Sequence, residues 1–155
     1  MIRTQRAHLH VAALSHPGMS GKNNEDRFTV LSFVLSKEDP TPAVFGLLCY
    51  GIGGHRAGEV AAEMAVNAIS ESVSKSNGRD PLSILEDALQ SASEAIAHHS
   101  ASSDDRQGMG STCACVWAIG DKLYIAYVGD SRIYLLRGDK MQQLTHDHTW
   151  VQEAV

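Results

Sequence analysis

The sequence predicts an α+β domain in which helices cover antiparallel sheets. Three observations carry this prediction: β-rich segments come first, two amphipathic helical segments follow, and a second group of β-rich segments closes the chain. A chain of 155 residues is long enough to bury most of its apolar surface in a single core. One domain over residues 1–155 is therefore expected.

The strands expected before the helices are residues 9–15, 27–35 and 43–49, all rich in apolar and β-branched side chains. A turn-like 16–18 and a polar loop over 20–26 separate the first two. Residues 37–42 carry two prolines and two acids, which predicts a hairpin loop. The run 43–49 is almost continuously apolar and predicts a central strand buried on both faces.

The two helices are predicted from apolar spacing and from their end signals. Val66, Ile69 and Val73 recur at helical spacing before Asn77-Gly78 ends the pattern. Asp80-Pro81 is an N-cap followed by proline at the first helical position. The second helix then carries apolar residues by threes and fours, at Leu82, Leu85, Leu89, Ala92 and Ile96. After a polar loop over 100–108, an antiparallel meander is expected over 112–119, 122–128 and 132–137, broken at 120–121, 129–130 and 137–140.

Composition excludes several classes of function. The chain has 13 Lys and Arg against 18 Asp and Glu and no basic stripe, so neither nucleic acid nor an anionic membrane is an expected partner. Cys49, Cys113 and Cys115 lie in apolar segments without C-x-x-C spacing, which favours buried thiols in a reducing compartment. The longest apolar stretches are far short of a membrane span. A cytoplasmic location is expected.

Five short segments combine small residues with acid, amide or imidazole side chains: 23–26, 51–59, 109–112, 128–132 and 144–148. This is the outline of a carboxylate-metal site that handles a phosphate. Taken alone, such segments are more typical of a turn than of a metal site. In this order they resemble the N-terminal part of the PPM-type, metal-dependent protein serine/threonine phosphatases, with the bacterial branch most similar.

The resemblance implies a four-layer α/β/β/α sandwich of two antiparallel sheets flanked by helices, with the C-terminal part missing. Residues 1–155 would be a partial PPM-type phosphatase domain, and the end at 153–155 falls inside an expected helix, as in an interrupted chain. The implied cofactors are Mn²⁺ or Mg²⁺. The implied partners are phosphoserine and phosphothreonine proteins of a serine/threonine kinase pathway.

The resemblance also assigns roles residue by residue. Asp26 and the carbonyl of Gly51 match metal-site positions, and Asp130 matches the position that helps to bind a further, weaker metal. His55 is a candidate general acid for the leaving alkoxide, with a packing or turn role as the alternative. Lys22 is the candidate phosphate-binding residue, because it adjoins the position of the family's phosphate-gripping arginine.

Two positions depart from the family pattern. Gly21 replaces that arginine, and Tyr50 replaces the aspartate that bridges the two metals. Two divalent cations about 4 Å apart repel each other by roughly 16 kcal/mol at an effective dielectric near 20, which a bridging carboxylate offsets and a phenol does not. The remaining metal-ligand aspartates of the family lie beyond this sequence. We therefore expect weak or absent catalysis, with a pseudophosphatase that binds or regulates, or a nonfunctional gene fragment, as alternatives.

Three further interpretations complete the prediction. A dinucleotide-binding G-x-G-x-x-G at Gly51 is disfavoured because Arg56 stands where the third glycine is needed. His146-Asp147-His148 favours a solvated turn over a metal site. Gly110, Ser111 and Thr112 are expected to approach the site without a catalytic part.

Overall fold

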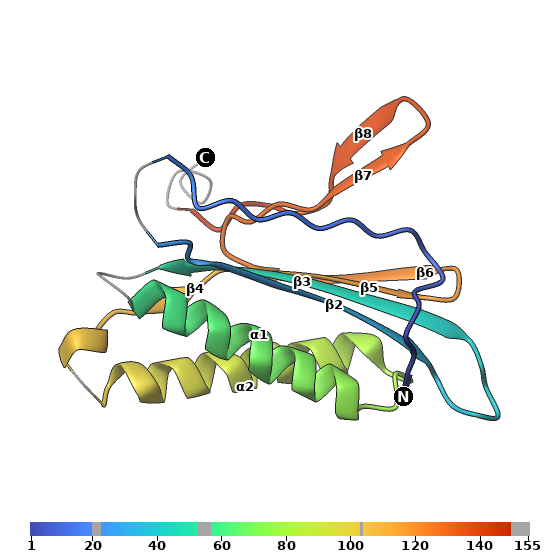
Figure 1. Ribbon diagram of the computed structural model, residues 1–155, viewed down its shortest axis with the longest axis horizontal. Helices are drawn as coiled ribbons and strands as arrows, with labels where there is room; N and C mark the ends of the chain where they lie inside the picture. Colours follow the sequence, from blue (N-terminus) through green and yellow to red (C-terminus); the bar gives the residue numbers. More distant parts are fainter. Residues whose placement is uncertain (20–22, 53–56, 103, 150–155) are drawn as a thin grey trace.

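The computed structural model describes residues 1–19, 23–52, 57–102 and 104–149. Both helices pack on one face of a six-stranded antiparallel sheet, while the N-terminal segment and a small hairpin lie over the opposite face (Figure 1). The α+β fold with two antiparallel sheets is thus confirmed. In chain order the elements are β1 (Ile2–Arg3), β2 (Asp26–Val34), β3 (Pro42–Ile52), α1 (Ala57–Lys75), α2 (Pro81–Ser100), a 3-10 turn (Asp104–Arg106), β4 (Gly110–Ser111), β5 (Cys113–Ile119), β6 (Lys122–Val128), β7 (Tyr134–Arg137) and β8 (Lys140–Gln143).

The large sheet has the strand order β1-β2-β3-β5-β6, and the short β4 pairs with the end of β3. β2 and β3 form the predicted hairpin, whose register runs from Asp26↔Tyr50 to Val34↔Pro42. β5 and β6 form a second hairpin, from Cys113↔Val128 to Ile119↔Lys122. The open ends of the two hairpins lie at the same end of the sheet. Segments that are far apart in the sequence therefore meet at this end.

The helices follow their predicted signals. The Asp80 side chain accepts a hydrogen bond from the Ser83 amide at 3.4 Å, and Pro81 opens α2. α1 ends at Lys75, and Gly78 then adopts a positive φ of 68°. No helix within the described ranges is long and apolar enough to cross a membrane.

The core lies between the two helices and the large sheet. Phe45 of β3 and Trp117 of β5 are fully buried and meet edge to face, with ring centroids 5.9 Å apart. Ile69 and Val73 of α1 and Leu85 of α2 close this core from the helix side. The side of the sheet that faces the helices is therefore filled by the core. The opposite face and the ends of the strands remain available for a functional site.

Three strand predictions need correction. Residues 9–15 form no strand; they are exposed and irregular, and they cross the face of the large sheet opposite the helices (Figure 1). β7 pairs with β8 and not with β6, because Gly129 at a φ of 96° turns the chain out of the sheet. β3 is not buried on both faces throughout, since Leu48 and Tyr50 are 42% and 46% exposed.

Candidate functional site

Three of the predicted site residues, Asp26, Tyr50 and Gly51, lie where β2 begins and β3 ends. Asp26, the first residue of β2, is the register partner of Tyr50. Beside this pair, the Gly51 amide donates to the Glu25 carbonyl at 3.1 Å. Two segments that are far apart in the sequence are thus adjacent in space.

The loop before β2 is held by its own amide side chain. Asn24 Oδ1 accepts a hydrogen bond from the Asp26 amide at 2.9 Å, and Asn24 Nδ2 donates to Ser15 Oγ at 2.7 Å. This is the backbone-serving role that Asn has in turns. It orients the half-buried Asp26 at the start of the strand.

Tyr50 occupies the position where the family resemblance places a bridging carboxylate. Its backbone is fixed by the segment that leads into β5: the Thr112 amide donates to its carbonyl at 2.8 Å, and its own amide donates to Thr112 Oγ1 at 3.2 Å. Its neighbours Cys49 and Gly51 are buried on the helix side, so strand alternation directs the Tyr50 side chain to the opposite, open face. Asp26 lies directly across the strand pair and shares that face.

Gly51 and Gly58 allow the end of β3 to press against the first turn of α1. A Cβ on Gly51 would overlap the backbone carbonyl group of Gly58. A Cβ on Gly58 would lie 3.0 Å from both the Gly51 carbonyl carbon and Glu25 Oε1. The glycines are therefore required by backbone packing, whatever further role the Gly51 carbonyl has.

The segment 129–131 joins the same end of the sheet beside β5. Ser131 Oγ lies 2.7 Å from Thr112 Oγ1. Gly129 has a φ of 96°, and a Cβ there would lie 2.7 Å from Thr112 Cγ2. Asp130 follows directly and is exposed. Because Val128 pairs with Cys113 at the last rung of the β5–β6 ladder, Asp130 lies just beyond the sheet end that carries Tyr50.

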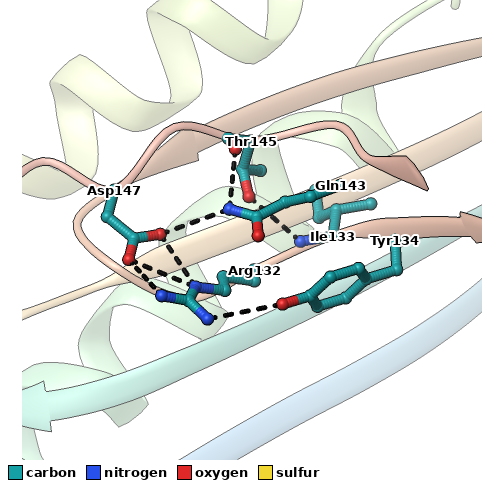
Figure 2. A network of polar contacts seen from close by, with 6 residues as sticks. All are labelled: Arg132, Ile133, Tyr134, Gln143, Thr145 and Asp147. Carbon is teal, nitrogen blue, oxygen red and sulfur yellow. Dashed lines mark hydrogen bonds and ion pairs between the residues drawn. The ribbon is translucent and has the colours of Figure 1, made fainter. Parts of the chain in front are cut away.

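An ion-pair network that the sequence pattern did not predict braces the chain after this segment (Figure 2). Arg132 Nη2 lies 2.6 Å from Asp147 Oδ2, and Arg132 Nε donates to both oxygens of the same carboxylate at 3.0 and 3.1 Å. Gln143 Nε2 donates to the Thr145 carbonyl at 2.9 Å, and Thr145 Oγ1 accepts from the Ile133 amide at 3.3 Å. The hydrogen bonds from Arg132 hold the pKa of Asp147 below its usual value.

The triplet 146–148 serves structure, in line with its interpretation as a turn. Asp147 pairs with Arg132, while the His148 ring stacks on Tyr127 at a centroid distance of 5.2 Å. His148 Nδ1 accepts from the Gly129 amide at 3.3 Å, and the His148 amide donates to the Gly129 carbonyl at 3.1 Å. The hydrogen bonds of His148 thus hold the backbone at Gly129, the residue that precedes Asp130.

A second ion pair that the sequence pattern did not predict lies beside Asp26. Arg27 Nη2 is 2.6 Å from Glu59 Oε1, and Arg27 Nη1 donates to the carbonyls of Asn24 and Asp26, each at 2.9 Å. The only sequence signal was a basic residue directly after an acid. The contact ties the loop before β2 to the first turn of α1, and it engages the carboxylate of Glu59.

Three residues with predicted roles, Gly21, Lys22 and His55, lie outside the described residues. The phosphate-binding assignment of Lys22 and the general-acid assignment of His55 stay predictions. Asp26, Gly51 and Asp130 stay predictions as metal-site residues, although all three lie at one sheet end.

The described donor set does not fit a two-metal centre. No group of three or more His, Cys, Asp or Glu residues that could hold a metal ion occurs in the described ranges. Mg²⁺ and similar ions favour about six oxygen ligands. At this sheet end Asp26 faces a phenol in place of a second carboxylate.

Fold and strand-end geometry together define the class of an antiparallel α+β domain with an acid- and glycine-rich site at one sheet end. The sequence pattern of the family Protein phosphatase 2C matches residues 16–154. The chain belongs to this family.

Bacterial phosphatases are among the proteins that the chain resembles. The chain is 35% identical over 147 residues to the serine/threonine protein phosphatase PstP of Mycobacterium tuberculosis, covering 95% of this chain and 26% of PstP. It is 35% identical over 151 residues to the serine/threonine phosphatase stp of Listeria innocua, covering 95% of this chain and 58% of stp. The chain therefore spans between about a quarter and three fifths of these relatives.

Solved structures agree on the fold. The crystal structure of M. tuberculosis PstP superposes with a TM-score of 0.71 at 33% identity, covering 88% of this chain and 53% of that one. The catalytic domain of PstP in complex with two manganese ions gives a TM-score of 0.72 at 33% identity, covering 88% and 54%.

Proposed function

We propose that this chain forms part of a protein serine/threonine phosphatase domain and hydrolyses phosphoserine and phosphothreonine weakly or not at all. Family membership and relatives named as serine/threonine phosphatases support the reaction class. The proposed loss of activity is inferred from Tyr50. Its side chain lies on the open face of the sheet, at the same sheet end as Asp26.

The charge of the side chain at position 50 determines how well this sheet end can hold cations. A carboxylate is ionised at neutral pH and offers two oxygens to cations, whereas a phenol is bulkier and uncharged. The catalytic domain of the relative PstP has been solved in complex with two manganese ions. We propose Asp26, the Gly51 carbonyl and Asp130 for whatever contact this chain makes with Mn²⁺ or Mg²⁺. The proposed substrates are phosphoproteins of a serine/threonine kinase pathway, in the cytoplasm.

A phosphate-release assay tests the proposed loss of activity. The chain is incubated with a phosphothreonine peptide and Mn²⁺, next to the Asp26→Asn variant as a background control. We expect release by the unmodified chain to equal that by the variant or to exceed it only slightly. Metal-dependent release that exceeds the variant's by orders of magnitude would contradict the proposal.

A phosphoprotein-binding module without turnover is the second candidate function. Its candidate binding surface is a polar crevice of about 570 Å³ beside the strand end, lined by Asn23, Asn24, Arg27, Glu59, Val60 and Glu63. The two amides and Arg27 can donate to a phosphate, whereas Glu63 opposes it and Arg27 is already paired with Glu59. Fluorescence anisotropy with a labelled phosphothreonine peptide and its unphosphorylated form distinguishes the two candidates. Phosphate-dependent binding without hydrolysis supports the module, and equal affinity for both peptides counts against it.

A further inference from the structure

We propose that Cys113 and Cys115 form a dithiol site that takes a small apolar thiophile, of the class of trivalent organoarsenicals. The ligand would enter through a cavity between the helices and the large sheet. The inference does not depend on phosphatase activity.

The two thiols are arranged for simultaneous binding to one atom. Cys113 and Cys115 alternate along β5 and therefore face the same side of the sheet, toward the helices. Their Sγ atoms are 3.4 Å apart, and both side chains are free and buried. The third thiol, Cys49, is also buried, on the adjacent strand β3.

A cavity of about 270 Å³ reaches Cys113, the outer thiol of this pair. It lies between α1, α2 and the β4–β6 side of the sheet, and Cys113 is part of its wall. Ile69, Leu89, Ile96 and Met109 make the remainder largely apolar. Ser93, Ala97 and Val128 also line it and are exposed, so the cavity opens to solvent along α2 and the end of β6.

The protonation of Cys113 determines which class of reagent can bind. The hydrogen bond to Cys115, the neighbouring Cys49 thiol and burial raise the pKa of Cys113, so its thiol stays neutral at physiological pH. Reagents that need a thiolate react slowly with such a group. An arsenoxide brings its own base: two As–S bonds form, the arsenic–oxygen bond breaks, and the oxygen leaves with both thiol protons as water. Arsenic stays trivalent, and no oxidant is needed.

The lining also disfavours a hydrated metal ion. Within the described residues no cluster of three or more His, Cys, Asp or Glu could hold one. A neutral molecule with an aryl group avoids the cost of burying charge in an apolar cavity. Two soft sulfur ligands suit the arsenic, and the cavity suits the aryl group.

Phenylarsine oxide tests the site on the full chain. Intact-protein mass spectrometry should show one phenylarsenic adduct per folded molecule, reversed by 2,3-dimercaptopropanol. Two thiols should be protected from an alkylating reagent that is added after denaturation of the labelled chain. Chelation by two tethered thiols should tighten binding by at least about 100-fold over a single thiol. Cys113→Ala and Cys115→Ala should therefore lose the adduct, whereas Cys49→Ala should keep it.

A variant that keeps all three thiols distinguishes blocked entry of the reagent into the cavity from misfolding of the chain. Ser93→Trp at the exposed mouth should slow the labelling of a protein whose circular dichroism is unchanged, and Leu82→Trp, at an exposed position of α2 outside the cavity lining, should not. Absence of an adduct on the folded chain would overturn the proposal. So would an adduct that persists in Cys113→Ala, or one lost equally in Cys49→Ala.

Discussion

At the scale of single residues, backbone contact decides which glycines are essential. Gly51 has no room for a Cβ, because the carbonyl group of Gly58 occupies that space. Gly110, in the strand segment that pairs with Ile52 beside it, has no heavy atom within 4 Å of the position that a Cβ would take. Gly51 therefore cannot accommodate a side chain, whereas Gly110 can, although both lie at the same sheet end.

Gly51→Ala should therefore destabilise the chain by about 1–3 kcal/mol or more, since the clash is with backbone and not with a flexible side chain. Gly110→Ala is the matched control and should change the free energy of unfolding by well under that amount. Urea denaturation followed by circular dichroism measures both. Equal midpoints for the two variants would show that the β3–α1 contact is looser than described.

The Arg132–Asp147 pair gives a pH-dependent contribution to stability. Because hydrogen bonds from Arg132 hold the pKa of Asp147 below its usual value, the folded chain favours the ionised carboxylate. This contribution is present above the unfolded-state pKa, about 3.9, and is lost as the pH falls through the lower folded-state pKa.

Asp147→Asn should thus lower the thermal midpoint near neutral pH, and its difference from the unmodified chain should shrink in acid. Asp139→Asn is the control, because it removes the same charge at an exposed hairpin position. Thermal scans at several pH values check this. A difference between Asp147→Asn and the unmodified chain that stays constant down to strongly acidic pH would contradict the assignment.

The place of Asp26 beside Tyr50 could be predicted from sequence, because the register of one hairpin is enough to bring the two residues together. The ion pairs could not be predicted in this way. Arg27 and Glu59 are 32 positions apart, and Arg132 and Asp147 are 15 apart. Such pairs depend on how separate elements dock, and local spacing carries no information about that.

At the scale of elements, the two helices and the hairpins β2–β3 and β5–β6 were predictable because caps, prolines and apolar spacing act locally. Residues 9–15 had strand-like composition and still form no strand. β-propensity reflects a fit to a neighbouring strand, and this segment lies across a sheet face and not along an edge. The pairing of β7 likewise depends on the turn at Gly129.

Trp117 of β5 is the largest fully buried side chain, and its indole Nε1 is buried without a hydrogen-bond partner in the described structure. Trp117→Ala should cost about 3–5 kcal/mol of unfolding free energy through the cavity it leaves. Trp117→Phe should cost clearly less, because it keeps a ring against Phe45 and removes the unpaired donor. Chemical denaturation ranks the two variants, and a cost for Trp117→Phe as large as that for Trp117→Ala would contradict this expectation.

At the scale of the whole molecule, the large sheet is covered unequally. The helix side is buried, whereas Phe28, Val30 and Leu48 on the other face are 42%, 37% and 42% exposed. Exposed apolar side chains on adjacent strands form the kind of surface that associates in water. The edge strand β6 adds unpaired backbone groups within the described sheet.

We therefore expect the chain to self-associate with rising concentration. Replacing Phe28 and Leu48 together by Thr should reduce association while preserving strand propensity. Leu82→Ser, which changes an exposed apolar residue of α2 on the other side of the molecule, should not. Sedimentation velocity measures all three proteins, and a monomeric unmodified chain at every concentration would refute the expectation.

We expect Tyr50, in place of a carboxylate, to weaken metal binding by this Protein phosphatase 2C chain. Calorimetric titration of Mn²⁺ into the unmodified chain and into Tyr50→Asp tests it most directly, with Tyr50→Phe as the control for loss of the hydroxyl. We predict weak binding to the unmodified chain and to Tyr50→Phe, and tighter binding to Tyr50→Asp, because a second carboxylate then faces Asp26. Tight binding of two Mn²⁺ ions by the unmodified chain, abolished in Tyr50→Phe, would make Tyr50 a ligand and contradict the account.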